Sequence, residues 1–141
     1  LKGVGPRIAM CVLKSWANAW TTSLRMQEAR ELPCIFGCPD CVDDLEHYIN
    51  CDPLWTVVIS CSSGLSELLH AGPHTKFGLC LDDSTIAWWR MLSIAFSCYH
   101  AIKIGHYSEI INSLESGNSC QVHSRLLEYA SAYANDLWTV I

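Results

Sequence analysis

Charged residues are scarce in this sequence. Only 16% of its 141 residues are charged, and 9 Lys and Arg against 14 Asp and Glu give a formal net charge of -5. Proteins that bind nucleic acids through the phosphate groups usually carry an excess of basic residues. This composition therefore argues against a chain that binds nucleic acid by its own electrostatic attraction.

A secretory signal is also missing, because no basic segment followed by an apolar core opens the sequence. The nine cysteines are odd in number, which disfavours a framework of disulfides. We therefore predict a reduced, intracellular protein, nuclear or cytoplasmic. The chain begins at Leu1 rather than Met, as a fragment of a longer protein would.

Strict alternation of apolar and polar residues, the pattern of β-strands, is absent beyond a few residues. Apolar residues instead recur at helical spacing. The sequence therefore predicts a mainly α-helical fold of about four or five helices around one core, in a single domain over residues 1–141, with a small Cys/His zinc knuckle inserted after the first helix. The expected helices cover 6–29, 45–50, 52 to about Gly64, 85–105 and 121–141.

The segment 85–105 is the most apolar of the chain and has the length of a membrane span. Polar residues nevertheless follow one another along it every three or four positions, which predicts one narrow polar stripe on a core helix. We therefore expect a helix with one solvent-exposed edge and no membrane contact. The residues of the stripe are Arg90, Ser93, Ser97, His100 and Lys103.

Catalytic motifs are lacking as well. No Ser-His-Asp or Cys-His order can be argued, and no glycine-rich phosphate loop occurs. The pair Asp82-Asp83, followed by Ser84, is interpreted as the cap of the helix that follows. We therefore predict that the chain is not an enzyme.

Cysteine is concentrated in residues 34–51, CIFGCPDCVDDLEHYINC. Thiolate and neutral imidazole are the usual ligands of zinc, which takes four of them in a tetrahedron. His47 and Cys51 are four residues apart and would share one face of a helix. Cys34, Cys38 and Cys41 compete for the other two positions. The alternative is that these cysteines are small buried side chains beside a core histidine.

Two residues favour a tight turn upstream of the histidine. Gly37 can adopt a positive φ, which would let the sulfurs of Cys34 and Cys38 converge. Pro39 fixes the bend in Cys38-Pro-Asp-Cys41, which has the spacing of a common zinc knuckle. The spacing alone therefore predicts zinc and leaves open which one of Cys34, Cys38 and Cys41 is not a ligand.

The segment RMQEARELPCIFGCPDCVDDLEHYINCDPLW resembles the zinc-binding region near the C-terminus of reverse transcriptases from non-LTR retrotransposons. That region has two close cysteines, an acidic residue, a histidine, a final cysteine and often an aromatic residue. Three residues rather than two separate the first pair here. The resemblance implies that zinc is held by Cys34, Cys38, His47 and Cys51, with Cys41 as the alternative to Cys34.

The resemblance also implies a function. In that family the region follows the polymerase and assists in binding template RNA or DNA, so the polymerase would lie outside this chain. Arg25 and Arg30 precede the knuckle and are the candidate nucleic-acid contacts. Many acidic residues surround them, and a local negative field repels phosphate. The alternative function is a zinc-stabilised domain that binds another protein and no nucleic acid.

Overall fold

The computed structural model describes residues 1–62, 66–80, 82–117 and 120–138. The predicted mainly helical fold is confirmed, and the only extended pairing among the described residues is an isolated bridge between Pro33 and Val42. Gly64 and residues 139–141, at the ends of two expected helices, lie outside the described part. The helices are α1 (Pro6–Trp16), α2 (Leu45–Ile49), α3 (Asp52–Ser62), the 3-10 helix η1 (Ser66–His70), α4 (Pro73–Lys76), α5 (Thr85–Gly105), α6 (Tyr107–Ser116) and α7 (Cys120–Trp138).

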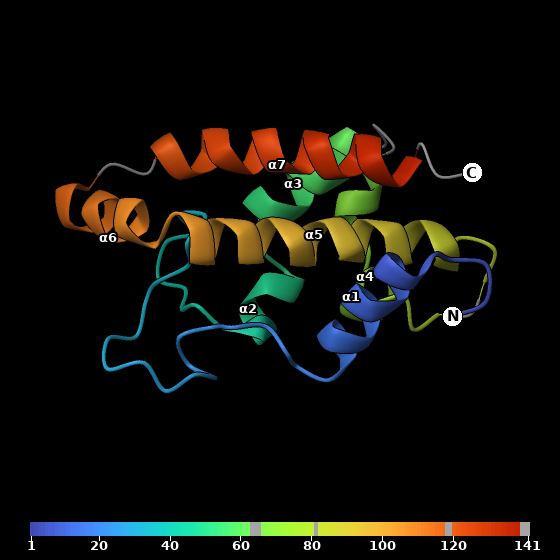
Figure 1. Ribbon diagram of the computed structural model, residues 1–141, viewed down its shortest axis with the longest axis horizontal. Helices are drawn as coiled ribbons and strands as arrows, with labels where there is room; N and C mark the ends of the chain where they lie inside the picture. Colours follow the sequence, from blue (N-terminus) through green and yellow to red (C-terminus); the bar gives the residue numbers. More distant parts are fainter. Residues whose placement is uncertain (63–65, 81, 118–119, 139–141) are drawn as a thin grey trace.

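Helix α5 runs through the middle of the molecule, as Figure 1 shows. It contacts α1, α3, α4, α6 and α7, while α3 also packs on α7. Helix α6 lies at one end, and the N-terminus and the end of α7 lie toward the other (Figure 1). Because α5 is covered on several sides, its apolar character belongs to a core helix. No helix within the described ranges combines the length and apolarity that crossing a membrane requires.

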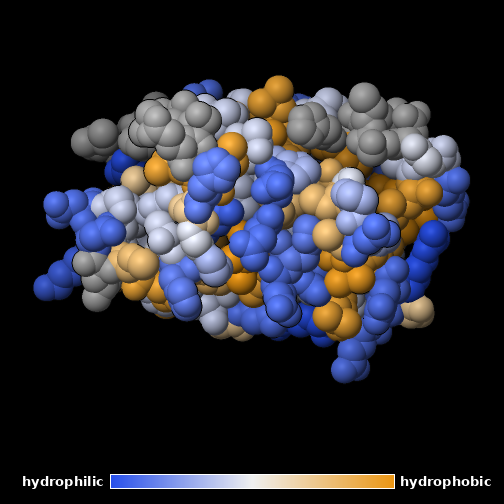
Figure 2. All heavy atoms as spheres, turned by 180° about the vertical axis from the view of Figure 1, so that it is seen from behind, coloured by the Kyte–Doolittle hydropathy of each residue, from blue (hydrophilic) through white to orange (hydrophobic). Residues whose placement is uncertain are grey.

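The surface on the far side of the molecule mixes hydrophilic and hydrophobic side chains (Figure 2). Hydrophobic side chains reach that surface more often in the half on the right of the view, which is the half that holds α6. Helix α6 and the short helix α4 were not expected from the sequence. A break at His106 separates α6 from α5, and Gly117 ends α6 in the left-handed conformation with φ of 70°.

The expectation of one helix over residues 6–29 is wrong, because α1 ends at Trp16. Trp16 and Trp20 would share one face of a continued helix. Trp16 lies near the surface, where its indole N–H donates to the Phe77 carbonyl, whereas Trp20 is 1% exposed and stacks against Tyr48. Asn18 adopts a φ of 49° and turns the chain inward. Burial of Trp20 therefore replaces the rest of the expected helix by an irregular segment over residues 17–44.

The expected solvent-exposed stripe on α5 is also wrong at two of its positions. Ser93 is fully buried, and Lys103 is 4% exposed. The ammonium of Lys103 lies 2.5 Å from a carboxylate oxygen of Asp43, which is itself fully buried, and 3.3 Å from Glu28. A charge is tolerated in a protein interior when it is paired and hydrogen-bonded. The irregular segment supplies the carboxylates of Asp43 and Glu28 as partners. The Lys103 ammonium is therefore stable in the interior without hydration by solvent.

The Asp43 carboxylate accepts hydrogen bonds from four residues in three parts of the chain. Besides Lys103, its carboxylate accepts from the Ser23 backbone N–H at 2.7 Å, from the Tyr48 hydroxyl at 2.6 Å and from the Tyr99 hydroxyl at 2.9 Å. Its own backbone N–H donates to the Leu32 carbonyl at 2.8 Å. One carboxylate therefore joins the irregular segment, α2 and α5.

We predict that Asp43→Ala lowers the free energy of unfolding by about 3–5 kcal/mol, because removing one partner of a buried ion pair leaves the other charge uncompensated. Urea denaturation of the two proteins would measure the difference. The matched control is Glu115→Ala, which removes the exposed pair between Glu115 and Arg30 and should cost at most about 1 kcal/mol. An equal cost for both variants would contradict the central role of Asp43.

Candidate metal centre

Four of the predicted ligands lie together in the fold. One ligand atom from each of Cys34, Cys38, His47 and Cys51 can be chosen so that all four lie within 4.8 Å of one another. The Cys51 sulfur is 3.8 Å from that of Cys34 and 3.7 Å from that of Cys38. These residues are therefore placed to hold a metal ion.

The sulfur positions match the geometry of tetrahedral coordination. Zinc–sulfur bonds of about 2.3 Å put two sulfurs on one tetrahedral ion about 3.8 Å apart. The distances from the Cys51 sulfur to the sulfurs of Cys34 and Cys38 agree with this edge length. A disulfide, by contrast, has its sulfurs about 2.0 Å apart. The described cysteines are free thiols, so the cluster has the spacing of metal ligands rather than of a bridge.

A tight turn brings the first two cysteines together. Gly37 has a φ of 87°, as its position predicts, and its N–H donates to the Cys34 carbonyl at 3.1 Å. The backbone N–H groups of Phe36 and Cys38 point at the Cys34 sulfur. Such N–H donors stabilise a thiolate, and a thiolate is the form that binds metal.

The other two ligands come from the junction of α2 and α3. The Asp44 carboxylate caps α2 by accepting the His47 N–H at 2.6 Å, and this fixes where the helix begins. The expectation that His47 and Cys51 share one helix is wrong. Helix α2 ends at Ile49, and Cys51 lies just before α3 begins at Asp52. The chain bend at Asn50 aims the two side chains at one point.

His47 carries a polar atom that the protein leaves unsatisfied. Its Nε2 is buried and has no hydrogen-bond partner within the described part of the chain. Buried polar atoms of this kind are rare, because each costs free energy when it lacks a partner. A bound cation would supply that partner, so the donor set and the orphaned nitrogen both fit a metal ion.

The three thiols cannot all ionise without a cation. The hydrogen bond from Cys51 lowers the pKa of Cys34 to about 5, against the opposing effect of burial. Burial and the negative charge of Cys34 raise the pKa of Cys38 to about 11. The pKa of Cys51 is raised strongly, because its thiol donates a hydrogen bond to Cys34 and is buried. One thiolate is therefore favoured in the protein alone. A metal ion would compensate the mutual repulsion and deprotonate the other two.

Tyr48 links this cluster to Asp43. Its hydroxyl donates to Asp43 and accepts the Ile35 N–H at 3.2 Å, one residue after Cys34. The Tyr48 carbonyl accepts the Trp55 indole N–H at 2.9 Å. Burial and the charge of Asp43 raise the pKa of Tyr48 well above its usual value, so the hydroxyl stays a donor. The backbone that carries Cys34 is thus held by a fixed, buried hydrogen bond.

The remaining predicted residues lie outside the cluster. Cys41 is half-buried and is not among the four grouped ligands, although its carbonyl accepts the Cys34 N–H at 2.8 Å. Arg25 and Arg30 are both exposed, and Arg30 forms an ion pair with Glu115 at 3.2 Å. The sequence analysis did not identify Asp43 and Tyr48 as supporting residues, because no local pattern shows the hydrogen bonds that Asp43 accepts from Tyr99 and Lys103.

Comparison with known proteins adds no relative. No protein-family model, curated protein or solved structure matches the chain. The resemblance to the zinc-binding region of non-LTR reverse transcriptases therefore stays a prediction, and the arguments for function depend on the geometry of the cluster.

We predict that Tyr48→Phe weakens metal binding about 10- to 100-fold, the usual effect of removing a group that orients a ligand. The variant leaves the Ile35 N–H without its partner and removes one of the two hydroxyl groups that donate to Asp43 Oδ1, so the turn at Cys34 loosens. Competition with a chromophoric chelator would measure the affinity. Tyr133→Phe, in α7 far along the chain from the cluster, is the control and should keep the affinity of the wild type. Equal affinities for all three proteins would contradict this supporting role.

Proposed function

We propose that the protein is a non-catalytic module stabilised by one Zn²⁺ ion, which Cys34, Cys38, His47 and Cys51 hold. The observation that supports this most directly is the convergence of four ligand atoms within 4.8 Å. Soft thiolates with an imidazole select zinc over magnesium or calcium, which prefer oxygen ligands. Four protein ligands fill the tetrahedron and leave no position for a substrate, as in structural sites.

The ion would add a bond between two segments of the chain that the side chain of Tyr48 already joins. Cys34 and Cys38 belong to the irregular segment, whereas His47 and Cys51 belong to the α2–α3 junction. Because the site does not exist in the unfolded chain, the free energy of metal binding contributes directly to folding. The role of the zinc is therefore to fix the irregular segment against the helices.

We expect one zinc per chain in protein purified without added metal, measured by atomic emission. Cys34→Ser and His47→Ala should lose the ion, because each removes one of the four ligands. Cys41→Ser is the matched control and should retain it. If Cys34→Ser keeps the zinc and Cys41→Ser loses it, then Cys41 rather than Cys34 is the fourth ligand. A wild type free of zinc under reducing conditions would refute the metal proposal.

The nucleic-acid role rests on the resemblance and on two exposed arginines. Arg25 and Arg30 both lie in the irregular segment that leads to Cys34, so a zinc-fixed segment would present them together. We propose that they contact the phosphates of template RNA or DNA beside a polymerase encoded elsewhere. The ion pair between Arg30 and Glu115 competes with such a contact, which favours weak binding.

We predict weak binding to single-stranded RNA or DNA that declines with salt, because two phosphate contacts release few counterions. Arg25→Ala and Arg30→Ala should each reduce affinity and flatten the salt dependence, measured by fluorescence anisotropy. Arg125→Ala, a partly exposed arginine on α7, is the control. If neither Arg25→Ala nor Arg30→Ala changes the affinity for nucleic acid, the result counts against this role.

A second candidate function, protein binding, is favoured by the outer face of α1. Met10, Leu13 and Trp16 follow one another every third residue there and are 53%, 49% and 40% exposed. Exposed apolar patches on a folded protein often mark interaction surfaces. Absence of nucleic-acid binding together with self-association that Leu13→Asp abolishes would select this alternative.

A further inference from the structure

Three side chains where α5, α6 and α7 meet form a chain of hydrogen bonds outside the Cys/His cluster. The Tyr129 hydroxyl lies 2.8 Å from Nε2 of His106, and Nδ1 of His106 lies 3.1 Å from a carboxylate oxygen of Glu109. Tyr129 comes from α7, Glu109 from the first turn of α6, and His106 from the break between α5 and α6. Tyr129 therefore joins the other two residues only in the folded protein.

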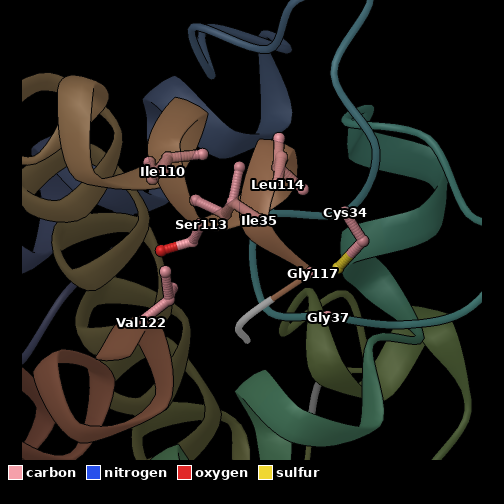
Figure 3. A pocket seen from close by; sticks show the side chains of 8 residues that line it. All are labelled: Cys34, Ile35, Gly37, Ile110, Ser113, Leu114, Gly117 and Val122. Carbon is pink, nitrogen blue, oxygen red and sulfur yellow. The ribbon is translucent and has the colours of Figure 1, made fainter. Parts of the chain in front are cut away.

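The packing of α6 against α7 holds this arrangement in place. Ile110 of α6, which follows Glu109, and Val122 of α7 line the same cavity (Figure 3). Ile110 is 1% exposed and Leu126 of α7 is fully buried, and the two helices are in contact. Leu126 and Tyr129 are three residues apart and share one face of α7. The core therefore fixes the Tyr129 hydroxyl opposite the start of α6.

The direction of the hydrogen bonds follows from the groups themselves. A carboxylate only accepts hydrogen bonds, so Nδ1 of His106 carries the proton that it donates to Glu109. In a neutral imidazole the other nitrogen is then an acceptor, and the Tyr129 hydroxyl donates to it. A guanidinium nitrogen of Arg125 lies 3.8 Å from the second carboxylate oxygen of Glu109. The carboxylate is thus held from two sides and fixes the tautomer of the ring.

A nucleophile, a base and a group that orients the base are the three parts of a site that transfers acyl groups to an oxygen. Tyrosine is one of the side chains that act as such a nucleophile. Tyr129, His106 and Glu109 stand in this order, and both distances fall in the range of about 2.6–3.2 Å that proton transfer needs. The His106 side chain is 17% exposed and Tyr129 is half-buried, so a reagent reaches them from solvent.

We propose that Tyr129 is an acyl acceptor, a nucleophile that takes an acyl group from an activated ester or thioester. The Tyr129 oxygen forms a bond to the acyl carbon, and the bond from that carbon to the leaving oxygen or sulfur breaks. The hydroxyl proton passes to Nε2 of His106 and from there to the leaving group. Glu109 is a positioning residue that keeps His106 in the accepting tautomer. The reaction modifies each chain once, and it goes beyond the proposed zinc role.

The test treats the whole protein with an excess of p-nitrophenyl acetate. Peptide mass mapping measures the acetylation of each tyrosine separately, so reaction at thiols does not enter the comparison. Tyr107 is the reference within the same molecule, because it is 42% exposed and access alone would favour it over Tyr129. Tyr129 should be acetylated at least about tenfold faster than Tyr107, since a general base contributes roughly 10²- to 10⁴-fold.

His106→Gln should slow the acetylation of Tyr129 about 100-fold and leave that of Tyr107 unchanged. Loss of a purely structural hydrogen bond would instead free the Tyr129 hydroxyl and keep or raise its rate, so the direction of the change separates the two roles. Glu109→Gln should also slow the reaction of Tyr129. Glu128→Gln, which changes an exposed carboxylate on α7, is the matched control and should react as the wild type.

The proposal is overturned if Tyr129 reacts no faster than Tyr107 in the wild type, a comparison that needs no variant. It is also overturned if His106→Gln or Glu109→Gln leaves the rate of Tyr129 unchanged. Urea denaturation shows whether each variant is folded under the conditions of labelling. Zinc content measured on the same samples separates a failure of this proposal from a failure of the zinc proposal, because the three residues lie outside the Cys/His cluster.

Discussion

The buried carboxylate of Asp43 is the group on which the rest of this structure depends. It is fully enclosed, and it accepts hydrogen bonds from the backbone of Ser23, from Tyr48 and Tyr99 and from Lys103. Burying a carboxylate lowers the stability of the folded protein unless its oxygens accept hydrogen bonds. Because the donors come from separate parts of the chain, the charge is stable only when those parts occupy their final positions. The polar interaction thus specifies one arrangement of an irregular segment that has no regular backbone pairing of its own.

The Cys/His cluster is connected to this carboxylate through one side chain. Tyr48 donates to Asp43, accepts from the backbone next to Cys34 and stacks against Trp20. It also follows His47 directly in the sequence. The position of the ligands is therefore set from two sides, by the capped helix α2 and by a hydrogen bond anchored in the core. Such outer support orients metal ligands and adjusts their affinity.

The sequence predicts the helical class, because periodic apolar segments such as residues 85–105 carry a local signal that folding preserves. It also predicts the positive φ of Gly37 and the group of cysteines and histidine that converge, since both depend on spacing over a few residues. It fails where distant residues decide. Trp20 leaves the helix for the core, and Lys103 is buried by a partner 60 residues away. No local pattern contains these contacts. The sequence therefore predicted a first helix that is too long and a polar stripe on α5 that is more exposed to solvent than it is.

The separation in sequence between partners has a consequence for the order of folding. All four members of the Cys/His cluster lie within residues 34–51, so their convergence closes only short loops, which cost little chain entropy. Asp43 lies inside this interval, whereas Lys103 joins it across 60 residues. A chain that closes the cluster first would hold the carboxylate in place before α5 arrives. The late, long-range step of folding would then be the docking of a nearly complete helix onto an acceptor that is already formed.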